Sequence, residues 1–326
     1  MKVGSRLNLF EDEEYHFIAQ LGVHHLALHG REELMTEPGE RGVVRADELR
    51  KLQEGLRPYQ LELYVFVLPQ RHNTQYWHAR IGDPSLRDRE IEDVCETVRI
   101  CGDLGIPVVE WTWYITRVCG RAYPQYETGR GGALVSFFDY DLVRDERPEG
   151  TIEMSAEQMW ANIIYFMERV MPVAEQAGVR MAVHPNDPPT KELGGEGRVL
   201  SSFDDMKRLV AEVDSPANGF NICQGTVAEM TDTDVLAVIR HFGERDRINH
   251  CHFRNVTGSV PRFQESFIDD GDVDMYEAMK VYHEIGYQHM MMPDHVPTMA
   301  GDESRRAARA YATGYIRAVM HVVGEL

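Results

Sequence analysis

Short apolar segments alternate with longer amphipathic segments along the whole chain, and the pair recurs eight times. The short segments are rich in Val, Ile, Leu and Met and predict buried strands, whereas apolar positions three or four residues apart in the longer segments predict helices. We expect strands at residues 3–9, 24–29, 61–68, 108–114, 179–184, 219–223, 248–253 and 289–294. We expect helices at residues 12–21, 46–56, 89–104, 156–177, 203–213, 234–242, 275–285 and 304–323.

Residues at the borders of these segments support the assignment. Ser202 and Asp274 stand just before expected helices, where a side-chain oxygen can cap free backbone N–H groups. Gly178 and Gly286 lie between an expected helix and the next strand, where glycine commonly ends a helix in the left-handed conformation. The borders therefore agree with the apolar pattern.

Eight strand–helix units in 326 residues match the size of a parallel barrel. The fold class we expect is α/β, a single (β/α)8 TIM barrel domain spanning residues 1–326. A doubly wound open sheet is the alternative, but no Gly-rich phosphate loop follows any expected strand. Residues 117–150 are rich in Gly and aromatic residues and lack periodicity, so we expect a long loop that covers the barrel mouth.

Composition excludes several classes of function. The formal charge is −19, from 34 Lys and Arg against 53 Asp and Glu, and such a field repels nucleic acids and anionic membranes. An anionic small substrate would need a metal ion or nearby arginines to overcome it. No apolar stretch approaches the ~20 residues of a membrane span, and the N-terminus shows no signal peptide, which predicts a cytoplasmic location. Five cysteines without a framework spacing favour a reduced compartment, and the assembly is left open, a homo-oligomer included.

Residues that can bind a metal stand at the ends of the last four expected strands. His184, Cys223 and Asp294 close their segments, and His252 lies near the end of its own. Because the carboxyl ends of barrel strands meet at one face, these side chains can converge on one ion. Two imidazoles, a thiolate and a carboxylate suit a divalent first-row metal. The pattern therefore predicts a metalloenzyme.

Each of these residues also has an ordinary structural interpretation. A His at a strand end is often a satisfied polar group, a lone Cys is often a small buried residue, and Asp294 can cap a helix. Their joint occurrence on consecutive strand ends favours one site over four coincidences. Side chains alternate along a strand, so Cys251 should point away from His252 and pack against a helix, while His250 should lie one layer below His252.

Polar residues next to the ligand candidates are candidate substrate contacts. Arg254 lies two residues beyond His252 on the same face, where its planar guanidinium can hold a carboxylate. We expect Asn186 and Asn255, each close to a ligand candidate, to contact the substrate as well. Glu265 and the acidic run at 269–274 lack the spacing of an EF-hand loop, so we interpret them as a substrate or supporting loop, with a solvated turn as the alternative.

Several segments resemble the motif series of the mannonate dehydratases and occur in that family's order. They are Arg130-Gly-Gly-Ala, His184-Pro-Asn-Asp-Pro-Pro, Cys223-Gln-Gly, His252-Phe-Arg-Asn-Val, Gly271-Asp-Val-Asp-Met-Tyr and Pro293-Asp-His. The resemblance implies a xylose-isomerase-like barrel that uses Mn²⁺, or another divalent first-row metal, to dehydrate D-mannonate to 2-keto-3-deoxygluconate. It also implies metal binding by His184, Cys223, His252 and Asp294, catalysis by His295, and contact between Arg254 and a small anionic sugar acid.

One departure from the family bears on the chemistry. The family places a tyrosine that joins in catalysis before its last helix, but the segment from Asp294 to Arg306 contains none. Three functions are therefore weighed: a metal-dependent sugar-acid dehydratase, which is a lyase; a metal-dependent sugar isomerase or epimerase of the same superfamily; and a non-catalytic barrel that binds a sugar acid. The dehydratase is the first choice because of the resemblance, and the intact ligand set argues against the non-catalytic barrel.

Overall fold

Eight parallel strands close into a barrel in the order β1-β15-β12-β11-β8-β4-β3-β2. The computed structural model describes residues 1–36, 42–69, 76–115, 127–147 and 151–326. The barrel strands are β1 (Lys2–Arg6), β2 (His25–His29), β3 (Glu62–Val67), β4 (Val108–Thr112), β8 (Arg180–His184), β11 (Asn218–Cys223), β12 (Ile248–His252) and β15 (Met290–Met292). All eight expected strands are present, and the expected (β/α)8 fold class is confirmed.

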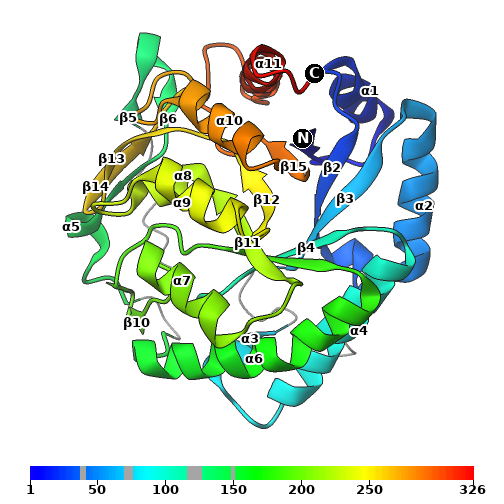
Figure 1. Ribbon diagram of the computed structural model, residues 1–326, viewed down its shortest axis with the longest axis vertical. Coiled ribbons are helices and arrows are strands. Elements are labelled where there is room, and N and C mark those ends of the chain that lie inside the picture. Colours follow the sequence, from blue (N-terminus) through cyan, green and yellow to red (C-terminus); the bar gives the residue numbers. More distant parts are fainter. Residues whose placement is uncertain (37–41, 70–75, 116–126, 148–150) are drawn as a thin grey trace.

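Helices surround the barrel on its outside (Figure 1). They are α1 (Asp12–Gln20), α2 (Ala46–Leu56), α3 (Trp77–Ile81), α4 (Arg87–Asp103), α5 (Tyr140–Val143), α6 (Ala156–Ala177), α7 (Phe203–Glu212), α8 (Gln224–Glu229), α9 (Val235–Gly243), α10 (Met275–Glu284) and α11 (Arg306–Val322), with 3-10 turns at η1 (Glu32–Leu34), η2 (Arg57–Tyr59) and η3 (Arg130–Gly132). The eight expected helices are all present. The sequence did not predict α3, α5 and α8, because helices this short show no apolar period.

The helix borders form as the sequence predicts. The Ser202 side chain accepts a hydrogen bond from the backbone N–H of Asp205 at the start of α7. Asp274 does the same for the backbone N–H groups of Tyr276 and Glu277 at the start of α10. Gly178 adopts φ +66°, the left-handed conformation that turns the chain from α6 into β8.

Alternation of side chains divides the apolar core into two layers. A small cluster fills the barrel interior, formed by Ala27, Tyr64, Val65, Val67, Val108, Ala182, Met290 and Met292. A larger cluster lies between barrel and helices, where Trp111 of β4 packs on Phe166 of α6 with ring centroids 5.1 Å apart. Cys251 belongs to this outer layer and lies 3.2 Å from the Tyr282 hydroxyl of α10, as its parity in the strand predicts.

Part of the expected covering loop has regular structure. Residues 127–147 contain β5 (Glu127–Thr128), β6 (Leu134–Val135) and β7 (Phe137–Asp139), while 116–126 and 148–150 lie outside the described residues. β7 joins β14 (Arg262–Glu265) and β13 (Val256–Ser259) in an antiparallel sheet, and β9 (Glu192–Leu193) pairs with β10 (Glu196–Gly197). These small sheets are built on segments that follow β4, β8 and β12, so they extend from the carboxyl ends of the barrel strands (Figure 1).

The two ends of the chain meet where the barrel closes. β1 pairs with β15 on one side and with β2 on the other. The amino group of Met1 lies 2.9 Å from Glu325, and Arg6 at the end of β1 lies 2.8 Å from Asp294. The first and last strands are therefore joined by backbone pairing, and ion pairs join the segments next to them.

The structure also bears on the cysteines and on membrane-spanning segments. The cysteines of the described segments, Cys95, Cys101, Cys223 and Cys251, are free thiols. No helix in the described parts of the chain has the length and apolar character needed to cross a membrane.

Candidate metal centre

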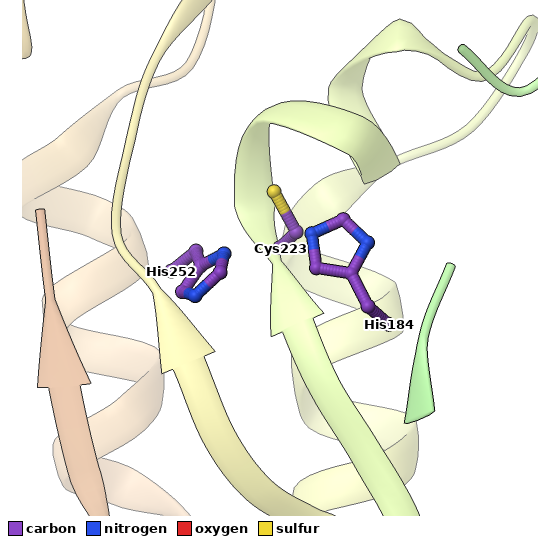
Figure 2. A group of neighbouring side chains, drawn as sticks. All are labelled: His184, Cys223 and His252. Carbon is purple, nitrogen blue, oxygen red and sulfur yellow. The ribbon is translucent and has the colours of Figure 1, made fainter. Parts of the chain in front are cut away.

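The predicted ligands converge at the carboxyl ends of β8, β11 and β12 (Figure 2). One ligand atom from each of His184, Cys223 and His252 lies within 4.8 Å of the other two. The imidazole rings of His184 and His252 have centroids 5.3 Å apart. Asp294, just past β15, brings its Oδ2 to 3.4 Å from Nδ1 of His252. The structure thus places all four residues in one region at the barrel mouth.

Hydrogen bonds determine which nitrogen of each imidazole faces the cluster. Nδ1 of His184 lies 2.6 Å from the carbonyl oxygen of Pro185, so Nδ1–H donates to it and Nε2 is left for the cluster. Nε2 of His252 lies 3.1 Å from the side-chain amide of Asn221. Nδ1 of His252 faces Asp294 and has no hydrogen-bond partner within the described segments. A nitrogen directed at a carboxylate without a hydrogen bond is suited to bind a metal ion.

A second polar layer lies below His252 inside the barrel. Oε2 of Glu110 on β4 lies 3.0 Å from Nδ1 of His250 and 3.9 Å from Nε2 of His252. Burial alone would raise the pKa of Glu110, but the hydrogen bond with His250 lowers it well below its usual value, so the carboxyl group is ionised. A carboxylate beside the far nitrogen of a ligand imidazole orients the ring. Sequence analysis missed Glu110, although an acidic residue inside the apolar segment Val108-Val-Glu-Trp was a usable signal.

The charges in the cluster favour a cation. Burial would lower the pKa of His184, but the electrostatic interaction and hydrogen bond with Cys223 raise that pKa to about 10. Burial lowers the pKa of His252 well below its usual value, so this imidazole is neutral. A metal ion that binds the cluster must displace a proton from His184, as is usual when histidine becomes a ligand.

Arg254 lies at the centre of a buried network of charges. Its side chain is 2% exposed. All three nitrogens donate to protein acceptors: Nε to Cys223 Sγ (3.1 Å), Nη1 to Glu229 (3.0 Å) and Glu265 (2.9 Å), and Nη2 to Asp187 (2.8 Å) and Thr226 (3.0 Å). Burial would lower the pKa of Arg254, but the charges of Cys223, Glu265, Glu229 and Asp187 raise it well above its ordinary value.

This arrangement differs from the expectation that Arg254 holds a substrate carboxylate. That role needs a guanidinium with free donors, whereas here the donors are directed at Cys223 and at carboxylates of the protein. Gly225 packs against the same group, and a Cβ at this position would overlap the guanidinium. The geometry favours Arg254 as the residue that compensates the charge around Cys223.

Asn186 and Asn255, expected to contact substrate, are buried and bonded to backbone. Nδ2 of Asn186 donates to the carbonyl oxygen of Val199, while its Oδ1 has no hydrogen-bond partner within the described segments. Nδ2 of Asn255 donates to the carbonyl oxygens of Ile268 (3.3 Å) and Val273 (2.9 Å), and its Oδ1 accepts from the backbone of Val273 (3.0 Å). Both amides therefore hold the loops that shape the mouth.

His295 is the most accessible residue of the group. Its side chain is 38% exposed, compared with 4% for Asp294. Nδ1 of His295 lies 2.7 Å from Oε1 of Glu265, and Nε2 lies 3.5 Å from Oδ2 of Asp294. A small cavity between the strand ends and α11 is lined by Asp294, His295 and Tyr311 among others. An imidazole with a carboxylate on one nitrogen and access to solvent is suited to acid–base chemistry.

Sequence reasoning missed several members of the network. Asp187 lies in the polar loop after His184, and Arg6 ends the first strand. Both therefore lie at the carboxyl end of a barrel strand, where site residues are expected. Glu229 lies in the short α8 and had no sequence signal of its own. Its role follows only from the path of the chain after β11.

The fold and the site define a class of protein. They are those of a parallel (β/α)8 barrel with a candidate metal-ligand cluster of His, Cys and Asp at the carboxyl ends of its strands. The sequence model described as D-mannonate dehydratase (UxuA) matches residues 151–325, more than half of the chain. The chain belongs to the D-mannonate dehydratase family, a family of hydro-lyases.

Individual relatives agree with this assignment. The chain is 27% identical to the mannonate dehydratase of Thermotoga neapolitana over 355 aligned positions, which cover 90% of this chain and 94% of the relative. The crystal structure of mannonate dehydratase from Streptococcus suis superimposes with a TM-score of 0.84 at 25% identity, covering 100% of this chain and 96% of that one. A D-psicose 3-epimerase from Clostridium cellulolyticum gives a TM-score of 0.64 at 13% identity over 99% of both chains and shares the fold alone.

Arg254→Gln should lower the free energy of unfolding by about 3–5 kcal/mol, because it leaves buried carboxylates without their cation. Urea unfolding followed by circular dichroism measures this loss. The matched control is Arg240→Gln, which removes an exposed partner of Glu284 at 2.8 Å and should change stability by less than about 1 kcal/mol. Wild-type stability of Arg254→Gln together with a raised KM would instead make Arg254 a substrate contact.

Proposed function

We propose that this chain is a metal-dependent dehydratase of a sugar acid, with D-mannonate as substrate and 2-keto-3-deoxygluconate and water as products. The observation that carries the proposal is the cluster of His184, Cys223 and His252 at adjoining strand ends in a chain of the D-mannonate dehydratase family. The name of the Thermotoga neapolitana relative, which aligns over 90% of this chain, supports the choice of D-mannonate.

We propose that His184, Cys223, His252 and Asp294 hold one divalent first-row metal, with Mn²⁺ as the first choice. The residues fit such an ion because they offer nitrogen, sulfur and oxygen donors, and because Nδ1 of His252 has no hydrogen-bond partner within the described residues. When bound, the metal would polarise the carboxylate and C2 hydroxyl of the substrate and so make the C2 proton more acidic. Glu110 and Asn221 hold the imidazole of His252 in place from below.

His295 is proposed as the general acid that protonates the departing C3 hydroxyl. Its Nδ1 is held by Glu265, which leaves Nε2 on the side of Asp294. Exposure at the mouth allows the imidazole to exchange protons with solvent between turnovers. The family places a tyrosine that joins in catalysis before its last helix, but this chain has none between Asp294 and Arg306. We therefore propose that His295 carries more of the proton transfer here than in family members that have the tyrosine.

Residues 127–147 are proposed to cover the mouth and keep water away from the reacting carbon atoms. Support comes from the backbone pairing of Leu134 with Thr298, beyond β15. Arg130 in the same segment lies 2.8 Å from Asp269 and stacks on the ring of Phe267 at 4.2 Å. These contacts tie the segment to loops that follow β14 and β15.

A mass-resolved assay with sugar acids tests the function. Purified protein with MnCl₂ is incubated with D-mannonate and with a panel of other aldonates, and products are identified by mass spectrometry. The dehydratase gives a 2-keto-3-deoxy acid that has lost one water. A product of unchanged mass from an acid or a neutral sugar would favour the isomerase or epimerase, and binding without turnover would favour the non-catalytic barrel.

Cys223→Ser should weaken metal binding by at least about tenfold, because it replaces the soft thiolate of the donor set by a hydroxyl. Metal content after dialysis and competition with a chelator measure this effect. Cys251→Ser is the matched control, since Cys251 points outward to Tyr282 and its replacement should affect packing alone. Equal metal occupancy in Cys223→Ser and wild type would exclude Cys223 as a ligand.

His295→Asn should lower kcat by about 10²-fold or more, the usual contribution of general acid catalysis, while metal content and substrate binding stay near wild type. Steady-state kinetics and metal analysis separate these quantities. His321→Asn, on the exposed face of α11, serves as control and should have wild-type kinetics. A His295→Asn enzyme with more than about a third of wild-type kcat, far short of that loss, would remove His295 from the mechanism.

A further inference from the structure

Two buried arginines flank one aromatic ring at the end of β4. Arg80 of α3 and Arg198, just after β10, are 2% and 4% exposed. Their guanidinium carbons lie 5.7 and 5.8 Å from the ring centre of Tyr114. Two cations from separate elements are thus brought to the same small region.

Neither arginine has an anionic partner in the part of the chain that the structure describes. No ion pair joins Arg80 or Arg198 to a carboxylate, whereas Arg254 pairs with Asp187, Glu229 and Glu265. Nε and Nη2 of Arg80 and Nε of Arg198 are buried without a hydrogen-bond partner. Arg80 lies 4.0 Å over the ring of Tyr76, and Arg198 donates one hydrogen bond of 3.2 Å to the carbonyl oxygen of Pro188.

Within the described residues, the chain around the two arginines does not supply the missing charge. Glu196 is close in sequence to Arg198, but its Oε2 accepts from the backbone N–H of Ile115 at 3.0 Å and it forms no ion pair with either arginine. Buried guanidinium groups without an anionic partner, and with some nitrogens left without an acceptor, are costly, and they mark a place where an anion can bind.

The location of the pair connects it to the metal centre. Thr112 of β4 is in register with His184 of β8, so Tyr114 lies just beyond the strand end that adjoins this ligand. Glu110, Thr112 and Tyr114 share one parity, and Glu110 contacts His250 inside the barrel. Pro188, the acceptor for Arg198, lies in the loop that follows His184. The two arginines therefore border the mouth beside β8.

We propose that Arg80 and Arg198 form a subsite that binds the carboxylate of the substrate, a role that rests on the proposed function as a sugar-acid enzyme. A chain with a formal charge of −19 repels anions, so recognition of an acid requires local positive charge. Arg254 cannot supply it because its donors are already bonded to the protein. Guanidinium groups match the planar, two-oxygen geometry of a carboxylate.

Calorimetry with the metal-loaded enzyme tests the subsite. The ligands are D-mannonate and D-mannitol, the neutral polyol that lacks the carboxylate. Arg80→Gln and Arg198→Gln should each weaken D-mannonate binding by about 10- to 100-fold, the effect of losing hydrogen bonds to a charged group. D-Mannitol binding and metal content should not change. Arg240→Gln is the control for loss of one positive charge, because Arg240 is exposed and paired with Glu284.

Thermal unfolding separates recognition from a structural role. Removal of a buried charge that has no partner should leave the Tm of Arg80→Gln and Arg198→Gln unchanged or raised, and D-mannonate should raise the Tm of wild type more than that of either variant. A lowered Tm with unchanged D-mannonate affinity would overturn the proposal. Arginine-dependent binding of a sugar phosphate, with no binding of aldonates, would overturn the assignment to a carboxylate.

Different results would contradict the proposed subsite and the proposed reaction. If the wild type binds D-mannonate through Arg80 and Arg198 but does not dehydrate it, the subsite stands and the dehydratase proposal falls. If dehydration proceeds and both variants keep the wild-type KM for D-mannonate, the reaction stands and the subsite falls.

Discussion

One buried guanidinium balances the negative charge that collects around the candidate metal centre. Arg254 contacts the sulfur of Cys223 and the carboxylates of Asp187, Glu229 and Glu265, each of which comes from a different segment. In a low-dielectric interior these acids would repel one another without it. The same contacts fix the loop after β8, the helix α8 and the strand β14 relative to β12. The shape of the mouth thus depends on one charged side chain.

The barrel and the ligand candidates were predictable because both follow from local rules. Apolar segments of strand length alternate with amphipathic segments, and this alternation predicts a closed parallel sheet surrounded by helices. Residues at the ends of successive strands then share one face, and alternation decides that His252 points inward while Cys251 points to a helix. His184, Cys223, His252 and Asp294 came together for these reasons. Their proposed role as ligands rests on their joint position and on the resemblance to the family.

The surroundings of the ligands were not predictable in the same way. The sequence shows Arg254 close to His252 but not that Glu229 and Glu265 approach it, because their positions depend on tertiary contacts of α8 and β14. Arg80 lies on a helix too short to show a period, and Arg198 lies in a connection beside a small hairpin. Whether an arginine is paired is a property of the folded chain, and this property distinguishes Arg254 from the other two.

Closure of the barrel joins the most distant parts of the sequence, and it completes the set of four proposed metal ligands. β15 carries the chain to Asp294, and it is held between β12 and β1, whose last residue Arg6 pairs with that carboxylate. Contacts of such large sequence separation form late in folding, since the intervening chain must first be ordered. A nascent or partly folded chain therefore holds an incomplete ligand set. Metal uptake by all four proposed ligands would therefore report the completed fold, and a ribosome-bound chain that lacks its last strand would lack the carboxylate of Asp294.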